Sequence, residues 1–216
     1  MNADELVAEL MTGLRSEVAI ADPGAKPGDH GDDQRLRREA LARVRAALEA
    51  EALTAEAAAR GVESAAAEAV WLGASLADLS AVTGRSRQAA RKRWPDLGAI
   101  RRRRKWLSYH VDDVFYMVEL LVDRADRIAP DAAEGFEAAV RELSAAFERV
   151  KADFAEERAA EQTAARWVAM DELVDVRLRE VIAKAGTPSD GDGGFAVHGA
   201  GGVLGYYDHA TAAEQD

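Results

Sequence analysis

Apolar residues between positions 107 and 154 recur at alternating spacings of three and four, and this periodicity constrains the fold more than any other feature of the sequence. Such spacing is typical of α-helices that pack along one face. Two series carry it, on either side of Ala129 and Pro130: Leu107, Val111, Val114, Val118, Leu121, Ala125 and Ile128, then Phe136, Val140, Leu143, Phe147, Val150 and Phe154. Because a short turn joins them, they predict a long antiparallel helical hairpin or coiled coil over residues 106–185.

The first of these helices is apolar over a wider arc than one partner helix covers. Its additional apolar side chains lie off the main series: Trp106, Phe115, Met117, Leu120 and Val122. The helix therefore needs either a bundle within the chain, with the helix expected at 34–60 as a candidate partner, or a second subunit.

The remaining segments also predict an all-α protein. Residues 1–33 predict a short amphipathic helix that carries Leu6, Leu10, Leu14 and Val18, followed by a flexible linker at 21–33 rich in Pro, Gly and Asp. A helix is expected from 34 to 60, ended by Gly61, and another from about 62 to 72. The tail at 186–216 holds eight of the 17 glycines, so we expect it to be mostly disordered, with at most one hairpin.

Residues 73–94, GASLADLSAVTGRSRQAARKRW, contain the signals of two short helices. Ser75, with Asp78 three residues on, predicts a helix that starts at Leu76 and turns Leu79 and Val82 inward. Gly84 supplies the positive φ of a tight turn. Ser86 caps the second helix, and Pro95 ends it. Two short helices joined by a glycine turn, the second of them basic, are the arrangement of a helix-turn-helix.

This stretch resembles a segment of small actinobacterial helix-turn-helix DNA-binding proteins, in which a Gly-Ala-Ser start, an apolar helix, Gly-x-Ser and Arg-Gln-Ala-Ala recur. The resemblance covers about a tenth of the chain, and the helix expected just before it would complete a three-helix unit. Thr83 and Arg85 depart from the pattern, which usually has leucine and valine there. The resemblance implies a helix-turn-helix DNA-binding domain at 34–105.

Charge is strongly concentrated in the same region. Residues 85–105 carry ten cations against one anion, Asp96, in a chain whose net charge is −11. The acidic total therefore does not exclude nucleic acid as a partner of this segment.

The predicted orientation of the second helix assigns its side chains to parts of DNA. Ala89, Ala90 and Trp94 face the first helix, so the polar residues between them point outward. We expect base contacts from Arg87, Gln88 and Arg91. Phosphate contacts are expected from Ser86, Lys92, Arg93, Arg101, Arg102, Arg103, Arg104 and Lys105, because a flexible cation needs no base geometry.

No feature of the sequence predicts catalysis, a cofactor or a metal site. Cysteine is absent, the four histidines are scattered, and DGDGG at 190–194 lacks the later ligands of a calcium loop. GAGGVLG at 199–205 lacks the strand that a phosphate-binding loop follows. The absence of a long apolar run or a signal peptide predicts a cytoplasmic, nucleoid-associated protein.

These observations predict a sequence-specific DNA-binding protein, a dimeric transcriptional regulator whose long C-terminal helices serve assembly or bind a protein partner. A homodimer is expected because one short helix-turn-helix rarely binds a specific site tightly alone. Two alternatives remain open: a non-specific architectural protein of plasmid or chromosome maintenance, and a coiled-coil adaptor whose basic segment binds an acidic protein.

Overall fold

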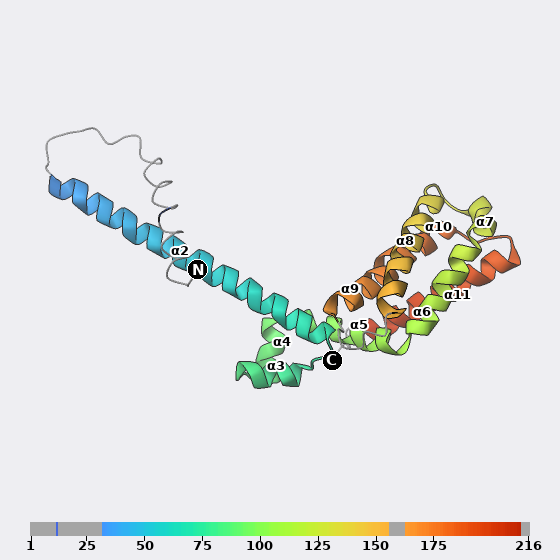
Figure 1. The fold of residues 1–216 in the computed structure, drawn as a ribbon, viewed down its shortest axis with the longest axis horizontal. Helices are drawn as coiled ribbons and strands as arrows, with labels where there is room; N and C mark the ends of the chain where they lie inside the picture. Colours follow the sequence, from blue (N-terminus) through green and yellow to red (C-terminus); the bar gives the residue numbers. More distant parts are fainter. Residues whose placement is uncertain (1–11, 13–31, 156–162, 213–216) are drawn as a thin grey trace. The chain divides into compact units, whose positions relative to one another are not determined.

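A computed structural model describes residues 12, 32–155 and 163–212, and within these ranges the chain is helical and contains no β-strand (Figure 1). The all-α prediction is confirmed. The elements are α2 (Asp32–Trp71), α3 (Leu76–Thr83), α4 (Arg87–Arg93), α5 (Leu97–Tyr109), α6 (Val111–Asp123), α7 (Ala125–Ile128), the 3-10 turn η1 (Ala129–Asp131), α8 (Phe136–Ala155), α9 (Ala164–Glu172), the π-helical stretch η2 (Leu173–Leu178), α10 (Arg179–Ala185) and α11 (Gly191–Thr211).

The chain divides into two compact units, residues 1–64 and 65–216. Apart from Thr12, the helix expected at 3–19 lies outside the described residues. Of the linker expected at 21–33, only Asp32 and Asp33 are described, and both belong to α2. The prediction that Gly61 ends a helix is wrong, because α2 continues through it. A glycine inside an exposed helix costs about 1 kcal/mol, which the alanine-rich turns around Gly61 offset.

The core of the second unit is a helical bundle around α6. Val114, Val118 and Leu121 of α6 are completely buried in it. Phe115 meets the ring of Phe147 of α8 edge to face, with 5.5 Å between the centroids. The two predicted apolar series therefore pack within one chain, as in the first of the two alternatives, and the buried residues of the first series are not available to a second subunit.

The expected hairpin helices are also shorter than predicted. At the junction of α5 and α6, the backbone N–H of His110 donates to Leu107 O at 3.2 Å, and its ring Nδ1 hydrogen-bonds Trp106 O at 2.8 Å. The ring also stacks on that of Trp106, with 4.4 Å between the centroids. These contacts satisfy carbonyl groups at the end of α5, so the helix ends there. Beyond η1, α8 ends at Ala155 and a separate helix, α9, begins at Ala164.

The glycine-rich tail forms α11, so the prediction of disorder is wrong for residues 191–211. Asp190 caps the helix and accepts from the N–H groups of Asp192 and Gly193, both at 2.9 Å. Four side chains of α11 are buried in the bundle: Ala196, Ala200, Leu204 and Tyr207.

Two glycines of α11 lie where the helix passes close to its neighbours. A Cβ on Gly199 would displace the flexible end of the Met117 side chain of α6, and one on Gly193 would lie 3.3 Å from the Ile128 side chain. The helix thereby covers the arc of α6 that α8 leaves uncovered. Burial of its apolar face compensates for the low helix propensity of glycine.

Two glycine substitutions test this packing. Gly186, which ends α10 at φ 66° and ψ −146°, lies in a backbone region open to glycine, and a Cβ there would be 2.8 Å from Asp131 O. Gly186→Ala should lower the free energy of unfolding by about 1–3 kcal/mol. In the matched control, Gly201→Ala meets open space within α11 and should raise it by about 0.5–1 kcal/mol. Equal urea midpoints for the two variants would contradict the backbone conformation at Gly186 and the packing described for residues 186–211.

Candidate nucleic-acid interface

α3, a glycine turn and α4 follow one another within residues 75–93, and local hydrogen bonds define their ends. The Oγ of Ser75 accepts from the N–H of Asp78 at 3.2 Å, and Asp78 Oδ2 accepts from the N–H of Ser75 at 2.7 Å. The bond from the backbone of Ser75 is also the main reason why the pKa of Asp78 is lowered. Gly84 has φ 64°, and the Oγ of Ser86 accepts from the N–H of Ala89 at 3.1 Å. The predicted helices, caps and turn are confirmed here.

A small apolar core holds these helices together. It consists of Ala66, Val70, Leu79, Ala90, Trp94 and Leu97, contributed by the end of α2, by α3, by α4 with its C-cap, and by the start of α5. Ala90 and Trp94 therefore anchor one side of α4, as predicted, while Ala89 is half-buried.

The prediction that Val82 points inward is wrong, because its side chain is 87% exposed. A rotation of about 100° per residue places Leu76, Leu79 and Thr83 on the buried side of α3 and Val82 beside it. The hydroxyl of Thr83, at the position where the related motifs have leucine, donates to Leu79 O at 2.7 Å. This bond satisfies the polar group that the substitution brings into the half-buried site.

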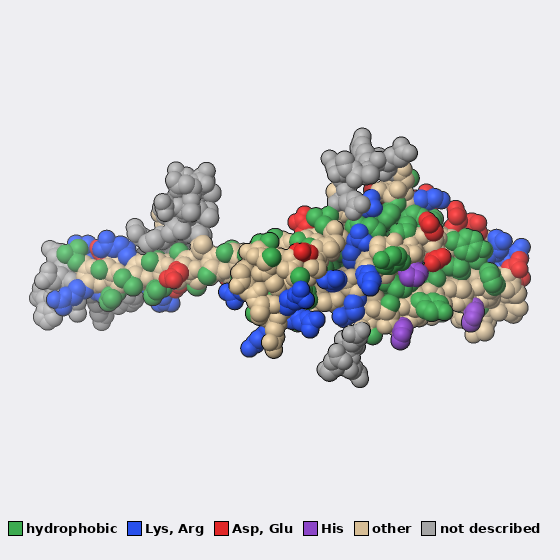
Figure 2. Space-filling model, turned by 90° about the horizontal axis from the view of Figure 1, so that it is seen from below, with side chains coloured by type: hydrophobic (Ala, Val, Ile, Leu, Met, Phe, Trp, Pro, Cys, Tyr) green, Lys and Arg blue, Asp and Glu red, His purple; other side chains and the backbone are tan. Residues whose placement is uncertain are grey.

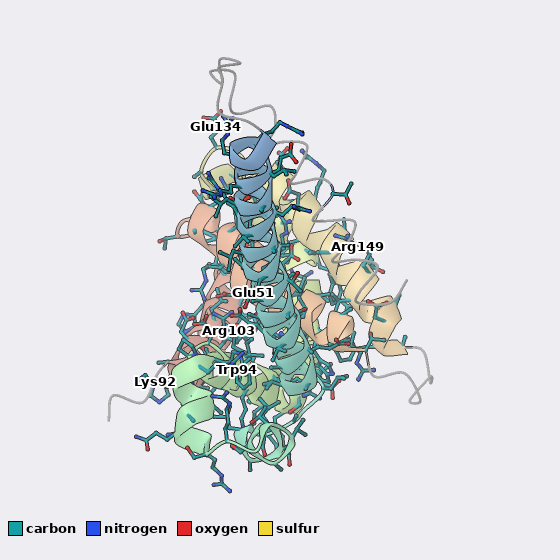
Figure 3. The ribbon with its side chains drawn as sticks, turned by 90° about the vertical axis from the view of Figure 1, so that its left-hand side faces the viewer. Glu51, Lys92, Trp94, Arg103, Glu134 and Arg149 are labelled. Carbon is teal, nitrogen blue, oxygen red and sulfur yellow. The ribbon has the colours of Figure 1, made fainter. Side chains whose placement is uncertain are left out.

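The other side of α4 is polar and exposed. Arg87, Gln88, Arg91 and Lys92 are all exposed, whereas Trp94 is buried at the end of the helix. Figure 3 shows Lys92 pointing away from the helices. Arg93 is exposed as well, and its guanidinium lies 5.2 Å from the centroid of the Trp94 ring. The three basic residues of the last turn complement the negative end of the helix dipole.

The cations of residues 101–105 divide into two groups. Arg101 and Lys105, one helical turn apart on α5, are exposed. The three between them have partners within the fold. Arg102 Nε donates to Thr211 O at 3.1 Å, and Arg104 Nε donates to Trp71 O at 2.9 Å. The guanidinium of Arg104 also stacks on Trp167, 3.4 Å from the ring centroid, and burial lowers its pKa.

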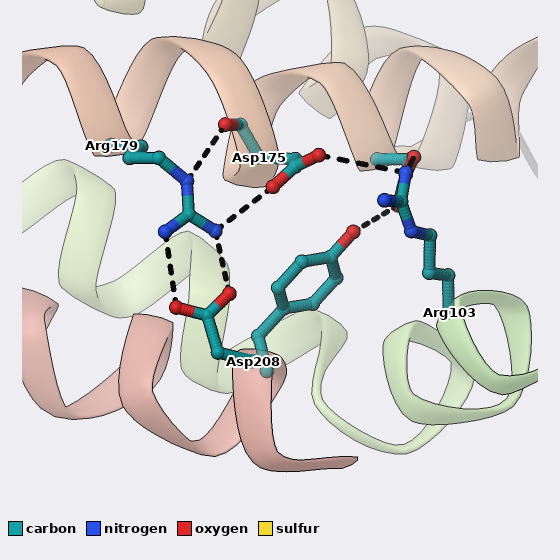
Figure 4. Close-up of polar contacts among 6 residues, drawn as sticks. Arg103, Asp175, Arg179 and Asp208 are labelled. Carbon is teal, nitrogen blue, oxygen red and sulfur yellow. Dashed lines mark hydrogen bonds and ion pairs between the residues drawn. The ribbon is translucent and has the colours of Figure 1, made fainter. Parts of the chain in front are cut away.

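Arg103 belongs to a polar network that joins α5 to the C-terminal helices (Figure 4). Its Nη1 donates to Asp171 Oδ2 at 3.1 Å and lies 3.5 Å from Asp175 Oδ2. Asp171 also accepts from the hydroxyl of Tyr207 at 2.5 Å. Burial raises the pKa of Asp171, and the bonds from Tyr207 and Arg103 oppose that rise.

Arg179 extends the network to the end of α11. Its Nη2 lies 2.9 Å from Asp175 Oδ1 and 2.6 Å from Asp208 Oδ1. The bond from Arg179 lowers the pKa of Asp208. The network therefore satisfies the charges of Arg103, Asp171 and Asp208 within the bundle.

Seven exposed cations remain, and we call them the basic surface: Arg85, Arg87, Arg91, Lys92, Arg93, Arg101 and Lys105. Figure 2 shows Lys and Arg side chains gathered over α4 and α5. Arg85 was missing from the sequence-based assignment, although its place directly after the turn glycine exposes it. The structure thus brings together the assigned residues of α4 with Arg101 and Lys105, and gives Arg102, Arg103 and Arg104 partners inside the fold.

Within the described residues, no three His, Asp or Glu side chains gather as metal ligands would. The helices described there include none with the length and apolar character needed to cross a membrane. Comparison of the chain with protein-family models, with curated proteins and with solved structures finds no match. The function is therefore argued from the basic surface itself.

The division of the arginine run predicts different results for two similar substitutions. Arg103→Ala should lower the free energy of unfolding at pH 7 by about 1–2 kcal/mol, because it leaves carboxylate oxygens of the bundle without a donor. Arg101→Ala, the matched control, should change it by less than about 0.5 kcal/mol. Urea unfolding measures both, and equal midpoints would contradict the structural role of Arg103.

The deficit of Arg103→Ala should also depend on pH. Burial raises the pKa of Asp171 in the folded state, and removal of the neighbouring guanidinium raises it further. An aspartate with a raised folded pKa destabilises the protein as pH rises above the unfolded value of about 3.9. The deficit should therefore be largest near pH 7 and should shrink as the pH falls towards 4. A deficit that grows on acidification would contradict this account.

Proposed function

We propose that the chain binds double-stranded DNA, with α3, the glycine turn and α4 acting as a helix-turn-helix and α4 as its recognition helix. One observation carries the proposal. α4 is anchored by Ala90 and Trp94 on one side and exposes Arg87, Gln88 and Arg91 on the other. A recognition helix needs this combination, because its inner side must hold the orientation while its outer side enters the major groove.

The exposed residues of α4 have the chemistry to distinguish base pairs. An arginine donates two parallel hydrogen bonds to O6 and N7 of guanine, and a glutamine pairs with N6 and N7 of adenine. We assign Arg87, Gln88 and Arg91 to these contacts. With seven residues, α4 is about 10 Å long, so it reads only a few base pairs. Specific binding therefore calls for a second copy on the same DNA.

We assign the phosphate contacts to cations at the end of α4 and on the exposed side of α5. Lys92, Arg93, Arg101 and Lys105 are exposed, and the nearby charge of Arg101 contributes to the lowered pKa of Asp78. The Ser86 hydroxyl accepts a bond from the helix it caps, and its own hydrogen is a donor for a phosphate oxygen. Arg102, Arg103 and Arg104 are better assigned to the fold than to phosphates.

The specific function we propose is that of a transcriptional regulator. Gln88 favours it over an architectural role, because a neutral amide between two arginines adds base discrimination but no attraction for phosphate. Selection of bound sequences from a pool of random duplexes is the first test. A recovered consensus supports the regulator, whereas tight binding without a consensus supports the architectural protein. Absence of duplex binding at low salt contradicts both.

Substitutions on α4 should weaken binding to the selected duplex more than binding to random DNA, whereas substitutions on α5 should weaken both equally. On the selected duplex, Arg87→Ala or Gln88→Ala should each weaken binding by about 1–3 kcal/mol, with a much smaller effect on random DNA. Arg101→Ala, the control, should weaken both alike. Fluorescence anisotropy with the two duplexes measures this. Equal losses on both duplexes for Arg87→Ala and Gln88→Ala, with unchanged circular dichroism, would contradict the role of α4.

The salt dependence of binding counts the phosphate contacts. If at least five cations of the basic surface neutralise phosphates, the logarithm of affinity should fall with the logarithm of salt concentration at a slope of roughly −4 to −5. The double variant Arg101→Ala/Lys105→Ala should make the slope shallower by about two. A flat response of the parent protein would exclude this mode of DNA binding.

A further inference from the structure

The part of α2 that lies in the first unit exposes a continuous apolar series, which we call the α2 seam. Its larger members are largely in contact with solvent: Leu41 is 68% exposed, Leu48 60%, Val44 56% and Val62 45%. With Ala52, Ala55 and Ala59 they recur at spacings of three and four over residues 41–62, a mean spacing of 3.5. Ala46 and Ala50, on the opposite side of the helix, are buried.

We propose that the α2 seam binds the α2 seam of a second copy of this chain in the antiparallel orientation. A spacing of 3.5 keeps the apolar side of one helix against a partner helix over its whole length. The seam extends over about three heptads, which is the lower limit for a helix pair of this kind. This inference concerns a different surface from the proposed DNA contact and does not depend on it.

Side-chain size favours a particular antiparallel register. If the two-fold axis passes between residues 51 and 52, Leu48 lies opposite Ala55 of the second copy, and Val44 lies opposite Ala59. Leu41 then meets Val62 at each end. The larger side chains of one half thus face the alanines of the other half, which lets the two backbones approach closely and fills the space between them. A parallel pair would instead place leucine against leucine in one half and alanine against alanine in the other.

Charge favours the same orientation. Residues 35–45 of α2 carry five arginines and one glutamate, whereas residues 49–63 carry four glutamates and one arginine. An antiparallel pair places the basic half of each helix beside the acidic half of the other, and a parallel pair places like charges together. In the proposed register, Arg45 lies within one turn of Glu56 of the second copy. The exposed pairs that Arg45 and Glu56 make within α2, with Glu49 and Arg60 respectively, are weak enough to exchange.

Glu51 opposes the association. It is exposed on α2 (Figure 3). The helical rotation of about 100° per residue places it at the edge of the seam, beside the proposed two-fold axis, so the two copies bring their Glu51 carboxylates together. Glu51→Gln removes this repulsion without changing the size of the side chain. It should therefore tighten the dimer, which is an unusual result for the removal of a surface charge.

Cysteine cross-linking tests the orientation directly, because the parent chain contains no cysteine. Leu41→Cys and Val62→Cys are prepared as separate full-length proteins, one of them with an affinity tag, and are oxidised alone and as a mixture. The antiparallel pair predicts disulfide-linked heterodimers in the mixture and little cross-linking of either protein alone. Efficient cross-linking of each variant alone indicates a parallel pair and contradicts the proposal.

Light scattering of the parent protein and of substituted variants completes the test. The parent protein should be dimeric by light scattering at micromolar concentration without DNA. Leu48→Asp should raise the dissociation constant by at least about tenfold, and Val82→Asp, an exposed apolar control outside the seam, should leave it unchanged.

Arg45→Glu and Glu56→Arg should each weaken the dimer, and their combination should restore it. A monomeric parent protein, or equal effects of the Leu48 and Val82 variants, overturns the proposal. Because no measurement here contains DNA, these results are independent of the DNA-binding assays.

Discussion

The wide apolar arc of α6, broader than one partner helix covers, is the constraint on which the second unit depends. In water such a helix must be covered from more than one side, and the chain supplies α8 for the arc around Phe115 and α11 for the arc around Met117. Residues of both apolar series recognised in the sequence are buried in this bundle. The need to cover α6 also explains why a segment with many glycines is helical, and two of these glycines, Gly193 and Gly199, lie where it passes close to α7 and α6.

The elements predicted well from the sequence are those defined by interactions within four residues. The capping box of Ser75 and Asp78, the turn at Gly84 and the cap at Ser86 each depend on neighbours in the chain, so residue type and spacing suffice. The errors concern partners far apart in the sequence. Arg102 donates to a carbonyl 109 residues away, and Arg103 to a carboxylate 68 residues away. Helical periodicity separates these arginines from Arg101, which is exposed on the same helix, but it does not identify the distant groups to which they donate.

This division of the arginine run refines the chemistry of the candidate interface. A run of five cations suggests a strip of charge for the DNA backbone, but a helix turns each residue by about 100°, so only Arg101 and Lys105 share the outer side. The inner arginines instead hold α5 to the ends of α2 and α11 and to α9. The same helix therefore links the stability of the bundle to the exposed charge that we assign to DNA.

Residue-resolved arginine reactivity tests the central claim most directly. The protein is treated with an arginine-specific dicarbonyl reagent, with and without saturating duplex DNA, and modified sites are identified by mass spectrometry. The account predicts that Arg87, Arg91 and Arg101 react quickly in the free protein and become protected by DNA, while Arg103 and Arg104 react slowly in both states. Unchanged reactivity of Arg87 and Arg91 at a DNA concentration that shifts all of the protein in a gel would contradict the account.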